Sequence, residues 1–230
     1  MQMVIICGGL ATRLGNLSKN IPKSMIDIEG KPFLLYQIEN LKKNNIKDIL
    51  LCVGHLSEKI IDYFGDGKKF GVNITYSYDK DKALGPIGAV KNAEKLLDDE
   101  FFIMYGDSYL SVDFQDAYNY FKKNNKPSMM VVYKNNDKFD KSNLIIKDNL
   151  VVGYGDKERT KDMKYIDYGT SLLTKNCLKF VPNNEFFSTG KFFSKLIKER
   201  NLRAYEVFKR FYHIGNPESL EEFRNFIKNR

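Results

Sequence analysis

Two adjacent glycines and an arginine follow the first apolar run of the chain, in the segment CGGLATRL at residues 7–14. Glycine lets the backbone approach a bound group closely and offer N–H donors to phosphate. Arg13 adds a planar, bidentate phosphate contact, and Lys23 supplies a second cation. The spacing matches neither the P-loop nor the dinucleotide fingerprint. The segment therefore predicts a polyphosphate site, with a ligand-free tight turn as the alternative.

Two further polar signatures each follow a strand-like run. Residues 84–89 read LGPIGA, which predicts either a backbone-lined slot for a flat nucleobase or an ordinary helix-start turn. Gly106 and Asp107 follow the run FFIMY. A carboxylate beside a phosphate site is a hard oxygen ligand suited to Mg²⁺, although Gly-Asp is also a common turn.

These signatures need a scaffold that brings strand ends together. Apolar runs predict strands, and residues at helical spacing predict helices, in alternation over the first half. The strands are expected at 3–7, 49–53, 72–76 and 101–105, and the helices at 33–44, 57–64 with Ser57 as cap, and 89–97. This order predicts a parallel, doubly wound α/β sheet, which binds ligands at the carboxyl ends of its strands.

The second half has a more mixed pattern. Helices are expected at 113–124, 191–200 and 217–229, the last capped by Asn216, and strands at 128–133, 143–146, 150–152 and 165–173. The aromatic run Glu185-Phe186-Phe187, with Phe192 and Phe193, predicts either a core helix or part of a dimer surface.

The ordered set of motifs resembles the nucleotidyltransferases that make nucleotide-activated sugars. The matching residues are Gly8, Gly9, Thr12, Arg13, Leu14, Pro22, Lys23, Gly30, Lys31, Pro32, Phe33, Leu84, Gly85, Gly88, Ala89, Gly106 and Asp107. Looser matches follow at 156–157, 166–169 and 212–217, so the resemblance covers about residues 2–225. It is strongest to the heptose- and mannose-1-phosphate guanylyltransferase group.

The resemblance implies one nucleotidyltransferase domain over residues 1–230. Residues 1 to about 110 would bind nucleotide, and about 111–230 would bind sugar phosphate. The implied fold is Rossmann-like and GT-A-like: a mixed, mainly parallel sheet with helices on both faces and no β-helix tail. The implied reaction joins NTP and a sugar 1-phosphate into NDP-sugar plus pyrophosphate, for surface glycan precursors.

Site roles follow from the same resemblance. Arg13, Lys23 and Asp107 would be catalytic, with Mg²⁺ at Asp107. The nucleotide would contact Gly8, Gly9, Thr12, Arg13, Gly85 and Gly88, the last facing the base. The sugar phosphate would contact Lys157, Asp167 and Gly169.

The chain departs from the family pattern at four positions. Ala11 replaces a glycine, Pro86 replaces a threonine, and Asp167 replaces an asparagine. His213 stands where the family has a second metal-binding aspartate, and imidazole is a poorer Mg²⁺ ligand than carboxylate. We therefore expect His213 either to touch the ion through water, to contact phosphate, or to be structural.

Composition narrows the classes of function. The 230 residues carry a net charge of +8, which favours anionic partners, but no basic cluster or motif indicates nucleic-acid binding. The sequence contains no run of about 18 apolar residues, so it predicts no membrane span. Two histidines exclude a multi-histidine zinc site, and three widely spaced cysteines indicate a reduced, cytoplasmic protein.

Three questions stay open from sequence. A cytidylyltransferase for phosphocholine or another small phosphorylated metabolite, and a non-catalytic nucleotide sensor, are the alternatives to the sugar enzyme. The base is unassigned, because Asp79 and Asp81, which precede the slot, could either serve guanine or face solvent. A homodimer is neither required nor excluded.

Overall fold

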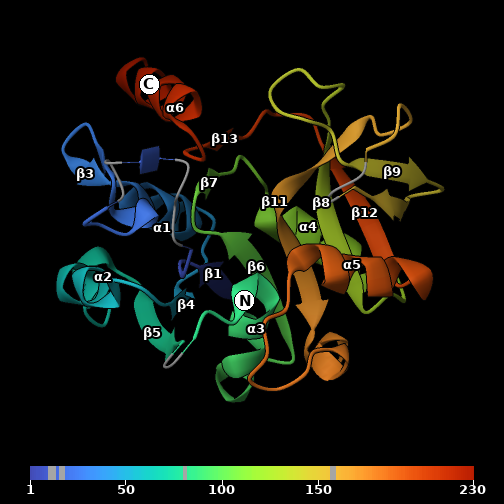
Figure 1. The fold of residues 1–230 in the computed structure, drawn as a ribbon, viewed down its shortest axis with the longest axis horizontal. Coiled ribbons are helices and arrows are strands. Elements are labelled where there is room, and N and C mark those ends of the chain that lie inside the picture. The colour runs from blue at the N-terminus through green and yellow to red at the C-terminus, as the bar shows by residue number, and fades with distance from the viewer. Residues whose placement is uncertain (10–13, 16–18, 80–81, 156–158) are drawn as a thin grey trace.

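A computed structural model of the chain describes residues 1–9, 14–15, 19–79, 82–155 and 159–230. Its core is a nine-stranded sheet in the order β5-β4-β1-β6-β11-β8-β12-β10-β9 (Figure 1). The strands are β1 (Gln2–Ile6), β4 (Asp48–Val53), β5 (Asn73–Tyr78), β6 (Glu100–Tyr105), β8 (Ser128–Lys134), β9 (Leu144–Lys147), β10 (Leu150–Tyr154), β11 (Tyr165–Thr174) and β12 (Leu202–Val207).

The sheet is mixed, and the expectation that it is mainly parallel is correct only for the first half. Parallel pairing joins β5, β4, β1 and β6, and also β8 with β12. Antiparallel pairing joins β6, β11 and β8, and then β12, β10 and β9. The pairing of β9 with β10 has a local cause: the two strands form a hairpin around Asp148 and Asn149, both at positive φ, and hairpin strands are antiparallel.

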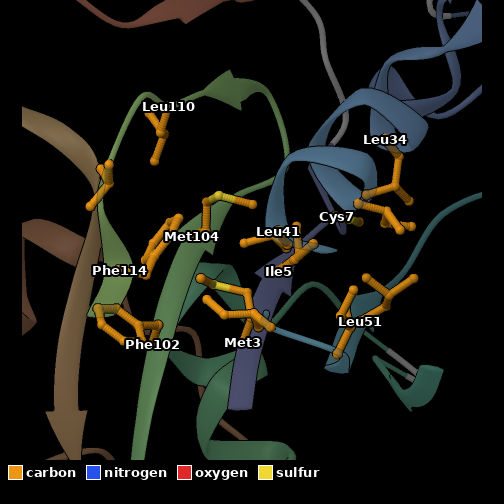
Figure 2. Close-up of a cluster of buried hydrophobic side chains, with 14 of the residues drawn as sticks. Met3, Ile5, Cys7, Leu34, Leu41, Leu51, Phe102, Met104, Leu110 and Phe114 are labelled. Carbon is orange, nitrogen blue, oxygen red and sulfur yellow. The ribbon is translucent and has the colours of Figure 1, made fainter. Parts of the chain in front are cut away.

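Helices cover both faces of the sheet, as predicted. They are α1 (Phe33–Lys43), α2 (Ser57–Phe64), α3 (Gly85–Asn92), α4 (Phe114–Lys122), α5 (Thr189–Lys198) and α6 (Pro217–Lys228). Successive strand residues point to opposite faces. Met3 and Ile5 pack with α1, α2 and α4, whereas Val4 packs with α3 and α5. Figure 2 shows the first cluster, in which Phe102 and Phe114 meet at a ring distance of 5.2 Å.

A third cluster joins the two ends of the chain. The C-terminal helix α6 presents Phe223 to Phe33 of α1, with ring centroids 5.0 Å apart. Two small antiparallel ladders lie near it: β2 (Asp27–Ile28) with β3 (Lys31–Pro32), and β7 (Ser108–Tyr109) with β13 (Tyr212–His213). The second ladder places residues 212–215 beside the end of β6. No described helix combines the length and apolarity needed for a bilayer crossing.

Candidate active site

The carboxyl ends of β1 and β6 converge on a cavity of about 570 Å³. Ile6 at the end of β1 lies level with Tyr105 of β6, so the loops that follow both strands meet there. The cavity brings together five residues predicted for nucleotide binding or catalysis: Gly8, Gly9, Lys23, Gly85 and Asp107. Its other lining residues are Ile6, Cys7, Ser24, Asp79, Ala83, Pro86, Ala89, Tyr105, Gly106, Phe186 and Gly215.

Asp107 reaches this cavity through a turn that requires glycine at 106. The Gly106 N–H donates to the Ile6 carbonyl at 3.0 Å, and a Cβ at 106 would lie 2.6 Å from that same oxygen. No side chain fits there without moving β1. The backbone of Asp107 is tied on its other side, where its carbonyl accepts the Ile214 N–H at 3.0 Å.

A buried glutamine that the sequence analysis missed also supports this turn. Gln37 of α1 is 2% exposed, and its Nε2 donates to the carbonyls of Tyr105 (2.9 Å) and Ser108 (2.7 Å). The sequence carried a signal for this role: Gln37 is a polar residue on the apolar face of the helix, among Leu34, Ile38 and Leu41. Buried polar groups are hydrogen-bonded, so such a residue indicates a structural partner.

Lys23 and Asp107 form an ion pair inside the cavity. Lys23 lies in the short 3₁₀ turn Lys23–Met25, and its Nζ donates to Asp107 Oδ2 at 2.5 Å. Burial by itself would raise the pKa of Asp107, but the Lys23 charge and hydrogen bond outweigh it and lower that pKa. Ser108 Oγ donates to Oδ1 at 3.2 Å. The carboxylate is therefore ionised, and it is partly exposed where it lines the cavity.

A second cavity of about 310 Å³ adjoins the first and shares Tyr105, Asp107 and Gly215 with it. It contains two residues predicted to bind the sugar phosphate, Asp167 and Gly169. Asp107 thus borders both cavities. The remaining lining residues are Ser108, Asp140, Lys141, Asn143, Tyr154, Ile166, Tyr168, Phe211 and His213.

Asp167 is held by donors on both carboxylate oxygens. Tyr105 OH donates to Oδ2 and the Gly169 N–H to Oδ1, both at 2.9 Å. Burial raises the pKa of Asp167 to about 6, although both hydrogen bonds act to lower it. Gly169 has φ +100°, a conformation that favours glycine, and it marks the point where the pairing of β11 with β8 changes register.

His213 accepts a hydrogen bond on one ring nitrogen and has a carboxylate near the other. Nδ1 accepts the Gly215 N–H at 3.1 Å, and Nε2 lies 3.6 Å from Asp140 Oδ2. Burial lowers the pKa of His213 despite the charges of Asp107 and Asp140. A metal-ligand role would require the ring to give up one of these partners. Within the described residues, no group of three or more His, Cys, Asp or Glu side chains is arranged to hold a metal ion.

Gly88 does not border the cavity, in contrast to the expectation that it faces the base. A Cβ on Gly88 would lie 2.7 Å from the Glu185 carbonyl oxygen, so the glycine permits close packing of α3 against residues 185–187. Three other predicted site residues, Thr12, Arg13 and Lys157, lie outside the described residues.

Comparisons with known proteins found related sequences and structures. A protein-family model described as nucleotidyl transferase matches residues 2–230. The chain is 34% identical over 225 residues to the D-glycero-alpha-D-manno-heptose 1-phosphate guanylyltransferase of Campylobacter jejuni, covering 97% of this chain and 98% of that protein. It is 27% identical to mannose-1-phosphate guanyltransferase 2 of Candida glabrata, covering 96% of this chain and 63% of that protein.

A solved structure extends the likeness to three dimensions. The crystal structure of HddC from Yersinia pseudotuberculosis complexed with GMP-PN matches with a TM-score of 0.83 and 26% identity, covering 98% of this chain and 99% of that one. The family model and the solved structure both match the chain over nearly its full length. They agree with the cavity at the Gly106 turn and its Lys23–Asp107 pair in leading to one conclusion. The chain belongs to the nucleotidyl transferase family.

Proposed function

We propose that this protein transfers a guanylyl group from GTP to a sugar 1-phosphate of the heptose or mannose type, releasing pyrophosphate. The observation that carries the proposal is the pair of adjoining cavities that meet at Asp107. One has the glycine loop, Lys23 and the nucleobase slot, and the other has Asp167 and Gly169. Two phosphorylated substrates bound in these cavities would place their phosphates at the shared wall.

The chemistry needs no general base. A sugar phosphate oxygen, already ionised at neutral pH, would attack the α-phosphorus of GTP, and the bond from that phosphorus to the bridging oxygen would break. Pyrophosphate would leave with the electron pair. The work left to the protein is positioning and charge neutralisation. The Nζ of Lys23 contacts Asp107, which borders both cavities, and would neutralise the charge of the attacking phosphate and of the α-phosphate.

Mg²⁺ fits the donors present. The Asp107 carboxylate borders both cavities, and Mg²⁺ commonly binds one or two protein carboxylates while taking its remaining oxygens from substrate phosphates and water. Asp107 would hold the ion, which would neutralise phosphate charge. On binding, Lys23 would exchange the carboxylate for phosphate oxygens.

Asp79 supports guanine as the base. Its carboxylate borders the nucleotide cavity beside Gly85 and Pro86, and Oδ2 accepts the Leu84 N–H at 3.2 Å. Burial raises the pKa of Asp79, a cost that a hydrogen-bond donor from the ligand would offset. Guanine presents two adjacent donors on one edge, N1–H and the 2-amino group, and a carboxylate accepts both. The relatives named as guanylyltransferases agree with this choice.

The proposed setting is the cytoplasm. All three cysteines are free and buried, and burial raises the pKa of Cys7 to about 12, which suits unreactive thiols in a reducing compartment. A homodimer stays a prediction that light scattering on the purified protein will test.

Pyrophosphate release by the purified protein with Mg²⁺ tests the proposal. GTP, CTP, UTP, ATP and dTTP are each crossed with heptose, mannose, glucose, glucosamine and galactose 1-phosphates and with phosphocholine. Release that requires GTP and heptose or mannose 1-phosphate is expected. Release only with CTP and phosphocholine would replace the proposal with the non-sugar activity. Silence with every pair, alongside intact NTP binding by calorimetry, would favour a nucleotide sensor.

A further inference from the structure

Phe186 is an exposed aromatic residue at the mouth of the nucleotide cavity. The residue is 60% exposed, whereas its neighbour Phe187 is 6% exposed and packs in the core. Phe186 borders the cavity together with Asp79, Gly85 and Pro86. It comes from the second half of the chain, just before α5, while the other three come from the first half.

The backbone around Phe186 is fixed against the nucleobase slot. The Phe187 N–H donates to the Leu84 carbonyl at 2.8 Å, and the Phe187 carbonyl accepts N–H groups from Ile87 (3.1 Å) and Gly88 (3.3 Å). These three bonds hold the segment at the start of α3. The position of Phe186 beside the slot is therefore set by the fold and does not depend on the flexibility of a surface loop.

Gly85 brings the Phe186 ring into the slot. Gly85 has φ +71°, and a Cβ built on it would lie 2.9 Å from ring atom Cε2 of Phe186. The ring thus occupies the space that a side chain at 85 would fill. It meets the backbone that lines the slot, and the rest of its surface is left to solvent and the cavity.

We infer that Phe186 stacks on the nucleobase of the bound nucleotide. The inference rests on the proposed function, in that the cavity must hold a nucleotide. A flat base in the slot would bury apolar ring surface that is now exposed, and aromatic side chains stack on all bases because every base has a π-face. Asp79 would then contact the edge of the base, and Phe186 its face.

This division of contacts makes a specific prediction. Stacking contributes affinity with little discrimination among bases, whereas the edge contact at Asp79 discriminates. Loss of the Phe186 ring is therefore expected to weaken GTP and ITP binding by the same factor, since ITP differs from GTP only by lacking the 2-amino group. Loss of the Asp79 carboxylate should reduce the preference for GTP over ITP.

The test measures equilibrium binding of GTP and ITP by calorimetry on the full chain, without acceptor. Phe186→Ala is expected to raise both dissociation constants about tenfold, within the range for loss of one base–aromatic stack. Phe186→Tyr keeps the ring and should stay within twofold of the unchanged protein. Phe208→Ala is the matched control, because Phe208 is 84% exposed and borders neither cavity.

Several results would overturn the inference. A Phe186→Ala dissociation constant within twofold of the unchanged protein would do so, and so would a change in the ratio of GTP to ITP affinity. A change in oligomeric mass with unchanged affinity would assign Phe186 to a dimer surface instead. The binding assay contains no acceptor, so its outcome does not depend on whether the protein transfers a guanylyl group to a sugar phosphate. If the wild-type protein binds no NTP, both proposals are overturned.

Discussion

Gly88 offers the sharpest test of how the nucleobase slot is built. In Gly88→Ala the new Cβ would lie 2.7 Å from the Glu185 carbonyl oxygen and 3.1 Å from Leu84 Cβ. The oxygen belongs to a backbone segment held by three hydrogen bonds, so it cannot rotate away as a side chain would. Overpacking of this kind costs about 1–3 kcal/mol. Alanine in a helix interior stabilises the helix by up to about 1 kcal/mol relative to glycine, which offsets part of this loss.

The expected net loss in the free energy of unfolding is about 1–2 kcal/mol. For a chain of this size that corresponds to a fall in Tm of about 2–8 °C. Thermal unfolding followed by circular dichroism measures it, and GTP affinity should fall as well, because residues 185–187 carry Phe186. Gly9→Ala is the stability control, since a Cβ there meets no described atom within 4 Å.

The alternative role for Gly88 predicts a different effect on Tm. If Gly88 faced the base, alanine would weaken nucleotide binding. Tm would stay unchanged or rise slightly, because alanine has the higher helix propensity. An unchanged Tm would therefore refute the packing argument, whatever happened to affinity.

Three further predictions concern Lys23 and Asp107, where the two cavities meet, and Asp167 in the second cavity. Lys23→Ala is expected to lower turnover about 10²-fold or more, the scale for one preorganised electrostatic contact; pyrophosphate release measures it, and turnover within fivefold of normal would contradict the role. Asp107→Asn should lower turnover to a similar extent over a Mg²⁺ titration, and near-normal turnover at ordinary Mg²⁺ would remove Asp107 from the metal role. Asp167 has a folded-state pKa of about 6, above its usual value of 3.8, so its ionisation reduces stability as pH rises from about 4 to 6. Asp167→Asn should raise the free energy of unfolding by on the order of 1–3 kcal/mol at pH 8 and by little at pH 4; denaturant unfolding at both pH values checks this, and an equal effect at both would count against it.

Much of the first half could be predicted because buried parallel strands are continuous apolar runs. The runs at 3–7, 49–53 and 101–105 lie within one residue of β1, β4 and β6 at both ends. The helix starts expected at 33 and 57 were also correct, whereas one cap and one other helix start were wrong. Ser57 was expected to cap α2, but the N-cap is Leu56 at φ 58°, with no side-chain hydrogen bond. The helix expected at 89–97 begins at Gly85 and ends at Asn92, before a 3₁₀ turn.

Parts of the second half were not predicted. β12, LRAYEV, was missed although Leu202 and Ala204 are buried and alternate with half-buried residues; the strand lies between β8 and β10. The positions of Gly88 and Phe186 follow from a pairing of segments about 100 residues apart. Sequence spacing identified Asp107 and Lys23 as candidates, but only their convergence across the sheet brings their charges into contact.

The order of the strands also bears on whether the chain can be divided. β6 is paired on one side with β1 and on the other with β11, and α6 returns to pack against α1. A fragment ending near residue 110 would keep the glycine turn and Asp107 but expose the long edge of β6, an edge that invites association with other chains. It would also lose the aromatic cover of Phe33. We therefore expect that the proposed nucleotide and acceptor halves fold as one unit and not separately.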